Sequence, residues 1–276
     1  MRILLAIVAV LALAWGGWWF VSARALERAA EAALAAAPRA GIAVGHAGIE
    51  VRGFPNRLDL TISAPTMRDP ARMSAWSGPF VQLLSLSYKP WHWIAVLPDR
   101  QDLVILGEPV ALEAGRLQAS LVATPGLDLT LSRIHAAGSD IRLRGAGWQI
   151  GLAELRGALR QAAARLDAQE LALELTDLAP DRGLMARLPA ATELADTISN
   201  IRIGLELGLN APLDRHALAA PPQIADIVLR EVRLTWGRLE IDATGRLHPD
   251  ATGHAEGRIE LRMRHWRLAL AVAVAV

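Results

Sequence analysis

The chain has 276 residues, no cysteine and a formal net charge of +1 at pH 7. Without cysteine, disulfides, thiolate catalysis and cysteine-bound zinc are excluded. Lys89 is the only lysine among 29 basic residues, and no basic block predicts nucleic-acid binding.

The first predicted element is a membrane anchor. An apolar run without a charged residue extends over 19 residues from Ile3 to Val21. At about 1.5 Å per helical residue it reaches about 28 Å, close to the hydrocarbon thickness of a bilayer. Trp18 and Trp19 near its end are predicted to lie at the membrane interface, where indole rings are enriched. The run is longer than the apolar core of a signal peptide, so an uncleaved anchor is favoured over cleavage near 21–23 or 35–37.

The helix is predicted to continue as a stalk until Pro38 and Gly41 end it. Residues 1–40 then form the anchor and stalk, and residues 41–276 form a β-rich domain with a sub-boundary near 180–222. The long exported remainder favours an amino terminus inside the cell. We therefore predict a single-pass inner-membrane protein whose main domain lies in the periplasm.

From Ile42 onward, apolar and polar residues alternate over short runs separated by Gly, Pro, Asn or Asp, which is typical of strands. Strands are predicted at 42–52, 57–64, 81–88, 102–106, 110–113, 116–123, 127–134, 140–144, 169–176, 198–209, 227–236, 237–247 and 255–266. The first two flank Gly53–Asn56 and predict a hairpin. Residues 157–165 are predicted to be helical or irregular, and residues 181–197 to hold a short helix.

The predicted fold is mainly β: a transmembrane helix followed by a large antiparallel, curved β-sheet domain with a few short helices. Leu, Ile and Val line one face of many strands, and this face needs a cover. The sequence allows two covers for this face: the protein's own packing, or a lipid that fills a groove. The apolar tail from Ala269 to Val276 is too short to cross a bilayer. It is either a strand or helix buried in the domain, or the natural chain continues beyond it.

No sequence motif predicts catalysis, a cofactor or a metal. The seven histidines are scattered, and none forms a close ligand spacing. One segment combines the only tyrosine and the only lysine with Trp91 and Trp93. Because Trp, Tyr and Lys suit an interface, Tyr88, Lys89, Trp91 and Trp93 are candidate membrane-interface or ligand contacts. The alternative is a strand end whose aromatic rings plug the sheet.

The anchor, the Gly53-Phe54-Pro55 turn, the Ser87–Pro90 segment and the carboxy-terminal meander around Trp236-Gly237 resemble a proteobacterial envelope family of unknown function. The resemblance implies an inner-membrane anchor and carries no catalytic residues. The meander is also similar to the β-rich ends of AsmA-like envelope proteins, which implies lipid handling by analogy.

Three functions follow as hypotheses. The first is a non-enzymatic envelope protein that binds membrane lipid or another hydrophobic ligand along a β-sheet groove. The second is a structural or assembly partner of an envelope protein complex. The third is an envelope hydrolase, which would need a pocket with convergent His, Ser and acidic side chains.

Overall fold

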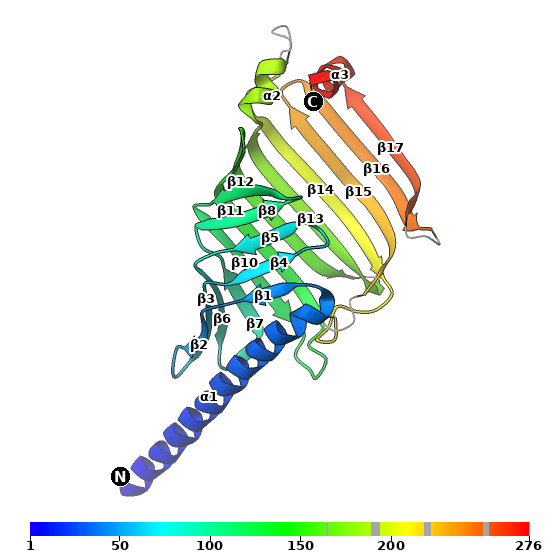
Figure 1. The fold of residues 1–276 in the computed structure, drawn as a ribbon. Coiled ribbons are helices and arrows are strands. Elements are labelled where there is room, and N and C mark those ends of the chain that lie inside the picture. Colours follow the sequence, from blue (N-terminus) through cyan, green and yellow to red (C-terminus); the bar gives the residue numbers. More distant parts are fainter. Residues whose placement is uncertain (164, 189–193, 218–221, 251–253, 276) are drawn as a thin grey trace. The chain divides into compact units, whose positions relative to one another are not determined.

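The structure is a computed structural model that describes residues 1–163, 165–188, 194–217, 222–250 and 254–275. The chain divides into two compact units, Met1–Val110 and Ala111–Val276. The fold is mainly antiparallel β, as predicted, with a long apolar helix at the amino terminus. Figure 1 labels the helices and strands.

Unit 1 begins with helix α1 (Arg2–Ala36), followed by a 3-10 turn at Ala37–Ala40. Its strands form two antiparallel ladders, β2-β3-β6-β7 and β1-β4-β5-β8. Their bounds are β1 Ala43–Gly45, β2 Gly48–Arg52, β3 Arg57–Ser63, β4 Thr66–Asp69, β5 Ser74–Ser77, β6 Phe80–Leu86, β7 Lys89–Val96 and β8 Arg100–Ile105. The unit boundary falls inside β9 (Glu108–Glu113).

The core of unit 1 joins the helix to the predicted hairpin. Trp19 and Ala23 of α1 are buried against Val51, Leu58 and Leu60 of β2 and β3. Strand alternation places Leu58 and Leu60 on the face that the helix covers. The half of α1 that follows Trp15 is therefore part of this unit's core, and the earlier turns are exposed.

Unit 2 is a meander in which each strand pairs antiparallel with the next from β10 to β17. Figure 1 shows β12 to β17 side by side in this order. The bounds are β10 Arg116–Ala123, β11 Leu131–Gly145, β12 Trp148–Ala162, β13 Arg165–Ala179, β14 Ile198–Leu209, β15 Ile224–Trp236, β16 Leu239–Pro249 and β17 Ala255–Arg264. Helix α2 spans Arg182–Arg187, and helix α3 spans Trp266–Ala275.

The strand register aligns apolar side chains across the meander. Three cross-strand rows share one face, which we call the apolar face. They are Leu159-Leu171-Leu205-Leu229, Leu173-Ile203-Val232-Ala243-Leu261 and Leu155-Leu175-Ile201-Leu234-Ile241-Met263. Because side chains alternate along a strand, the residues between these rows lie on the opposite face.

The opposite face is charged and laced by cross-strand ion pairs. Arg160 pairs with Glu170 at 2.6 Å, and Arg233 pairs with Asp242 at 2.8 Å. The guanidinium of Arg202 donates hydrogen bonds of 2.9 and 3.0 Å to Glu174. With a further bond from Asn200, it lowers the pKa of Glu174. This face suits water.

A second core lies at one end of the apolar face. Ile198, Trp236 and Leu239 are buried there. Met185 of α2 and Leu268 of α3 pack against them, and the Trp236 indole donates a 2.6 Å hydrogen bond to the Ala195 carbonyl. The two helices thus close this end of the face.

The strand predictions at 116–123 and 198–209 match β10 and β14 residue for residue. The prediction of helix or irregular chain at 157–165 is wrong, because residues up to Ala162 belong to β12 and β13 starts at Arg165. The predicted helix at 181–197 is confined to α2 among the described residues, and residues 189–193 lie outside them. The apolar tail is helical.

Candidate functional site

The apolar face extends across β12 to β17 in the described part of unit 2. The large side chains of its rows on β12 to β16 are half-buried. Ile201, Leu234 and Ile241 pack against the second core around Trp236, and the others belong to neither core cluster. Leu261 and Met263 on the edge strand β17 are exposed. A face that is apolar and incompletely covered can accept a hydrophobic ligand or partner.

A buried amide lies at the end of this face away from Trp236. Gln169 occupies the row Gln161-Gln169-Leu207-Ile227. Its side chain is 2% exposed, and its Oε1 atom has no hydrogen-bond partner among the described residues. Burying an acceptor without a partner is costly, so a donor from a ligand or from water is expected here.

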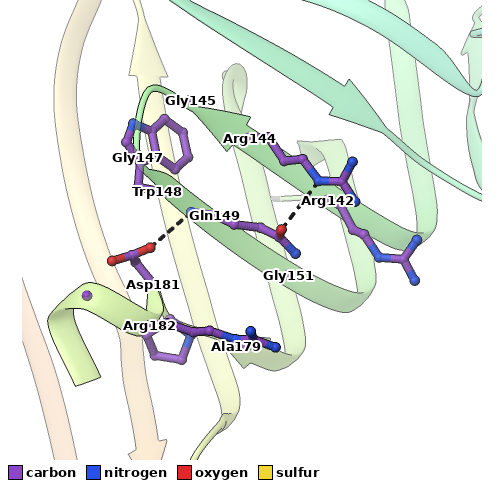
Figure 2. A pocket seen from close by; sticks show the side chains of 12 residues that line it. Arg142, Arg144, Gly145, Gly147, Trp148, Gln149, Gly151, Ala179, Asp181 and Arg182 are labelled. Atoms are coloured by element: carbon purple, nitrogen blue, oxygen red, sulfur yellow. Dashed lines mark hydrogen bonds between the residues drawn. The ribbon is translucent and has the colours of Figure 1, made fainter. Parts of the chain in front are cut away.

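A second feature is an open pocket of about 670 Å³ at the β11–β12 turn and the start of α2. Figure 2 shows its arginines, Arg142, Arg144 and Arg182, with Gln149 and Asp181. Arg144 is fixed by Gln149, 3.3 Å away, and by Glu113, 3.7 Å away. Arg142 pairs in register with Gly151, which also lines the pocket.

Asp181 has a structural role in this pocket. Its carboxylate accepts hydrogen bonds from the backbone N–H of Gln149 at 3.0 Å and of Leu184 at 3.1 Å, and it caps α2. These bonds, that from Gln149 foremost, lower the pKa of Asp181. The carboxylate therefore stays ionised at neutral pH and is engaged by the backbone.

The pocket can hold an anion and offers little for catalysis. Its lining contains three guanidinium groups, which bind carboxylate or phosphate. The lining residues include no Ser, Thr, Cys, His or Lys that could act as a nucleophile or a general base. None of the residues that line the pocket belongs to the three rows of the apolar face.

The predicted interface aromatics occupy different surroundings in unit 1. Trp18 is exposed by 55% on α1, whereas Trp19 is 6% exposed and its indole donates a 2.6 Å hydrogen bond to the Arg57 carbonyl. Tyr88 is 52% exposed in the β6–β7 turn, and Lys89 after it is also exposed.

Trp91 and Trp93 are half-buried on β7, and the Trp93 indole donates to the Pro90 carbonyl at 2.8 Å. Segment 89–96 is thus a strand, which sequence reasoning left as a local aromatic segment. An open hollow of about 290 Å³ lies beside its start. The lining combines apolar and basic side chains: Arg57, Leu84, Ser85, Leu86, Lys89, His92 and Ile94.

The contacts of Trp15 and Phe54 between the helix and the hairpin were not predicted from the sequence. The Trp15 indole donates a 3.1 Å hydrogen bond to the Pro55 carbonyl. Phe54 lies edge-on to Trp19, with ring centroids 5.4 Å apart, and stacked with Phe20 at 5.8 Å. The signals available were the Phe-Pro pair in the predicted turn and a tryptophan within the apolar run.

Among the described residues, no three His, Asp or Glu side chains gather in a way that could hold a metal ion. Helix α1 is the one described helix long and apolar enough to cross a membrane. Unit 1 thus contains a membrane-length helix, and unit 2 contains an incompletely covered apolar face.

Comparison with known proteins leaves the predicted likeness to AsmA-like proteins without support. No curated protein and no solved structure matches the chain. One family model matches residues 19–275, and its match begins at the first buried tryptophan of α1. The chain therefore belongs to a family described as an uncharacterised protein conserved in bacteria, DUF2125.

Proposed function

We propose that this protein is a non-enzymatic, single-pass inner-membrane protein whose main domain lies in the periplasm and binds lipid acyl chains along the apolar face. The observation that carries the proposal is the half-buried state of the large apolar side chains in the two adjacent rows that contain Leu171 and Leu173, which lie outside the second core. Self-packing would bury them as fully as Trp236 and Leu239 are buried.

The dimensions of the face suit an extended chain. Seven residue steps separate Ile227 from Leu234 on β15, which is about 23 Å at about 3.3 Å per residue. The second core around Trp236 closes one end of this length. Near the other end, Gln169 presents the buried Oε1 acceptor to a hydroxyl or amide group of the ligand.

The charged face is unsuited to lipid, so the proposed site lies on one face of the sheet only. Its arginines and carboxylates are already paired across strands, as in Arg202–Glu174 and Arg233–Asp242. Removing such a face from water would cost desolvation energy without new partners. A lipid would therefore lie on the apolar face alone.

The test is native mass spectrometry with lipid extraction on the full-length protein in mild detergent. The informative variant is Ile203→Lys, which places a charge in the middle row of the apolar face. The matched control is Ala172→Lys, because exposed Ala172 pairs with Gly204 on the charged face. Circular dichroism verifies the β fold of both.

We expect wild type and Ala172→Lys to retain a stoichiometric lipid and Ile203→Lys to lose it. If wild type carries no lipid, or Ile203→Lys keeps its lipid while remaining folded, the proposal is wrong. Recovery of a stoichiometric protein partner in place of lipid would favour the assembly role.

A further inference from the structure

The tip of the β2–β3 hairpin lies beside the membrane-length part of α1. Trp15 donates to the Pro55 carbonyl at 3.1 Å, and a Cβ atom built on Gly16 would lie 3.8 Å from the Phe54 ring. The tip is therefore level with Trp15 and Gly16. These positions precede the end of the apolar run at Val21 by five or six residues, about 8 Å along a helix.

The anchor has no length to spare. The full run from Ile3 to Val21 reaches about 28 Å, which barely matches the hydrocarbon core of about 30 Å. If the bilayer ended below the hairpin tip, only Ile3–Ala14 would remain, or about 18 Å. That length is too short to span, so the tip must share the depth of the last helical turns.

We propose that the hairpin tip Gly53–Asn56 is a second membrane-contacting element, which enters the lipid interface next to α1. Its side chains suit that place. Phe54 is 56% exposed, and no residue of the tip is charged. Arg52 and Arg57 stand at the ends of the flanking strands, where long basic side chains can reach headgroups.

Several backbone polar groups of the tip also have hydrogen-bond partners within the protein, as a lipid environment requires. Polar backbone groups in lipid need partners within the protein. Arg57 N–H donates to the Gly53 carbonyl at 2.8 Å, and Pro55 has no N–H to satisfy. The Pro55 carbonyl accepts from Trp15 and from the Ser87 hydroxyl, and the Asn56 carbonyl accepts from Ser87 N–H at 2.9 Å.

The neighbouring β6–β7 turn extends the same surface. Ser87 ties this turn to the tip by the two bonds just described. Exposed Leu86, Tyr88 and Lys89 flank it. An apolar side chain, a phenol and an ammonium group are the mixture found at membrane interfaces. The predicted interface role of Tyr88 and Lys89 thus gains a structural basis, which is their place beside the tip.

Because the chain has no cysteine, a single introduced cysteine can be labelled without background. The experiment places an NBD fluorophore on Phe54→Cys or Asn56→Cys in the full-length protein, in nanodiscs of phosphatidylcholine and phosphatidylglycerol. Asn56 is exposed and bonds through its backbone, so its substitution leaves the packing of Phe54 on α1 intact. The control is Leu106→Cys, another exposed apolar position on a hairpin turn of the same unit, next to Met73.

Nanodiscs that contain doxyl-labelled lipid should quench the fluorophore at residues 54 and 56 several-fold more than at residue 106. Equal and weak quenching at 56 and 106, with the fold intact by circular dichroism, would overturn the proposal. The outcome is independent of lipid retention on the apolar face, since the labels lie in unit 1 and the retained lipid is tested in unit 2.

Discussion

At the scale of single residues, the sequence does not show whether Trp19 contacts lipid or packs in the protein core. It lies in a run that is apolar on every side, so helical periodicity does not reveal which residues contact protein. The structure buries Trp19 on the hairpin and leaves Trp18 exposed. The difference arises from β2 and β3, which lie far from the helix in sequence.

We expect Trp19→Phe to destabilise unit 1 by about 1–3 kcal/mol, because the Arg57 carbonyl loses the indole donor and the smaller ring fills the site poorly. Chemical denaturation of the full-length protein in detergent measures the loss. Trp18→Phe is the control and should change stability by at most about 0.5 kcal/mol. Equal effects of both substitutions would contradict the packing role of Trp19.

Asp181 gives a prediction with a pH dependence. Its pKa is lowered in the folded protein, so its contribution to stability is complete above the unfolded pKa of about 3.9 and is lost as the pH falls through the folded value. We expect Asp181→Ala to destabilise the protein at pH 7. The gap to wild type should narrow at pH 3.

Denaturant midpoints at the two pH values measure this effect. Asp181→Asn is the control, because asparagine also caps helices and is uncharged. Its stability relative to Asp181→Ala should vary little with pH. An Asp181→Ala loss that stays the same from pH 7 to pH 3 would show that the carboxylate charge is not involved.

At the scale of elements, α1 is long and apolar enough to cross a membrane and is also part of the core of unit 1. Val51, Leu58 and Leu60 are buried under the part of the helix that holds Trp19 and Ala23. A cleavage near 21–23, the alternative weighed from the sequence, would remove Trp19 from this core. The packing therefore favours an uncleaved helix.

Two truncations test this dependence on α1. A chain that begins at Gly41 lacks the helix and should aggregate, because it exposes the apolar side of β2 and β3. A chain that begins at Ala14 keeps Trp15 to Ala36 and should elute with less aggregate in size-exclusion chromatography. Equal solubility of the two chains would show that the helix is dispensable for this core.

Elements differ in how far their sequences predict them. β10 and β14 alternate apolar residues with polar residues or glycine over much of their length, and their bounds were predicted correctly. Residues 157–162 contain good helix formers, yet pairing with β13 holds them in a strand, so tertiary contacts override propensity. β4 and β5 have four residues each, too few to show a period.

The sequence predicts that the candidate site is apolar, but not which residues come together to form it. Alternating leucines at 171–175, and alternating isoleucine and leucine side chains at 201–205, indicate an apolar face, and the register that aligns them into rows comes from pairing. The unpartnered acceptor of Gln169 depends on burial by distant segments, and no local pattern signals it. The Arg142 and Arg182 pocket likewise joins a strand end to a helix start.

At the scale of the whole molecule, lipid binding on the apolar face leads us to expect that removal of lipid changes thermal stability and dye binding. Protein stripped of lipid by extensive detergent exchange should melt at a lower temperature, because a ligand that binds only the folded state stabilises it. It should also bind an apolar fluorescent dye, and added fatty acid should displace that dye.

Differential scanning fluorimetry and a dye titration make these measurements. The control is Ile203→Lys, which should bind less dye than Ala172→Lys under the same conditions. If the stripped protein melts at the same temperature as the unstripped protein and binds no dye, the apolar face is covered by the protein itself.

The bonds from Trp15 and Trp19 to the hairpin have a mechanical consequence. A single-pass helix on a flexible tether can change its tilt without moving the domain that follows it. Here these two bonds join the helix to the β2–β3 hairpin over about one helical turn, so a tilt of one is a tilt of the other. A bilayer that thins or thickens changes the tilt of a spanning helix. In this protein, bilayer thickness would therefore set the angle at which unit 1 meets the membrane surface.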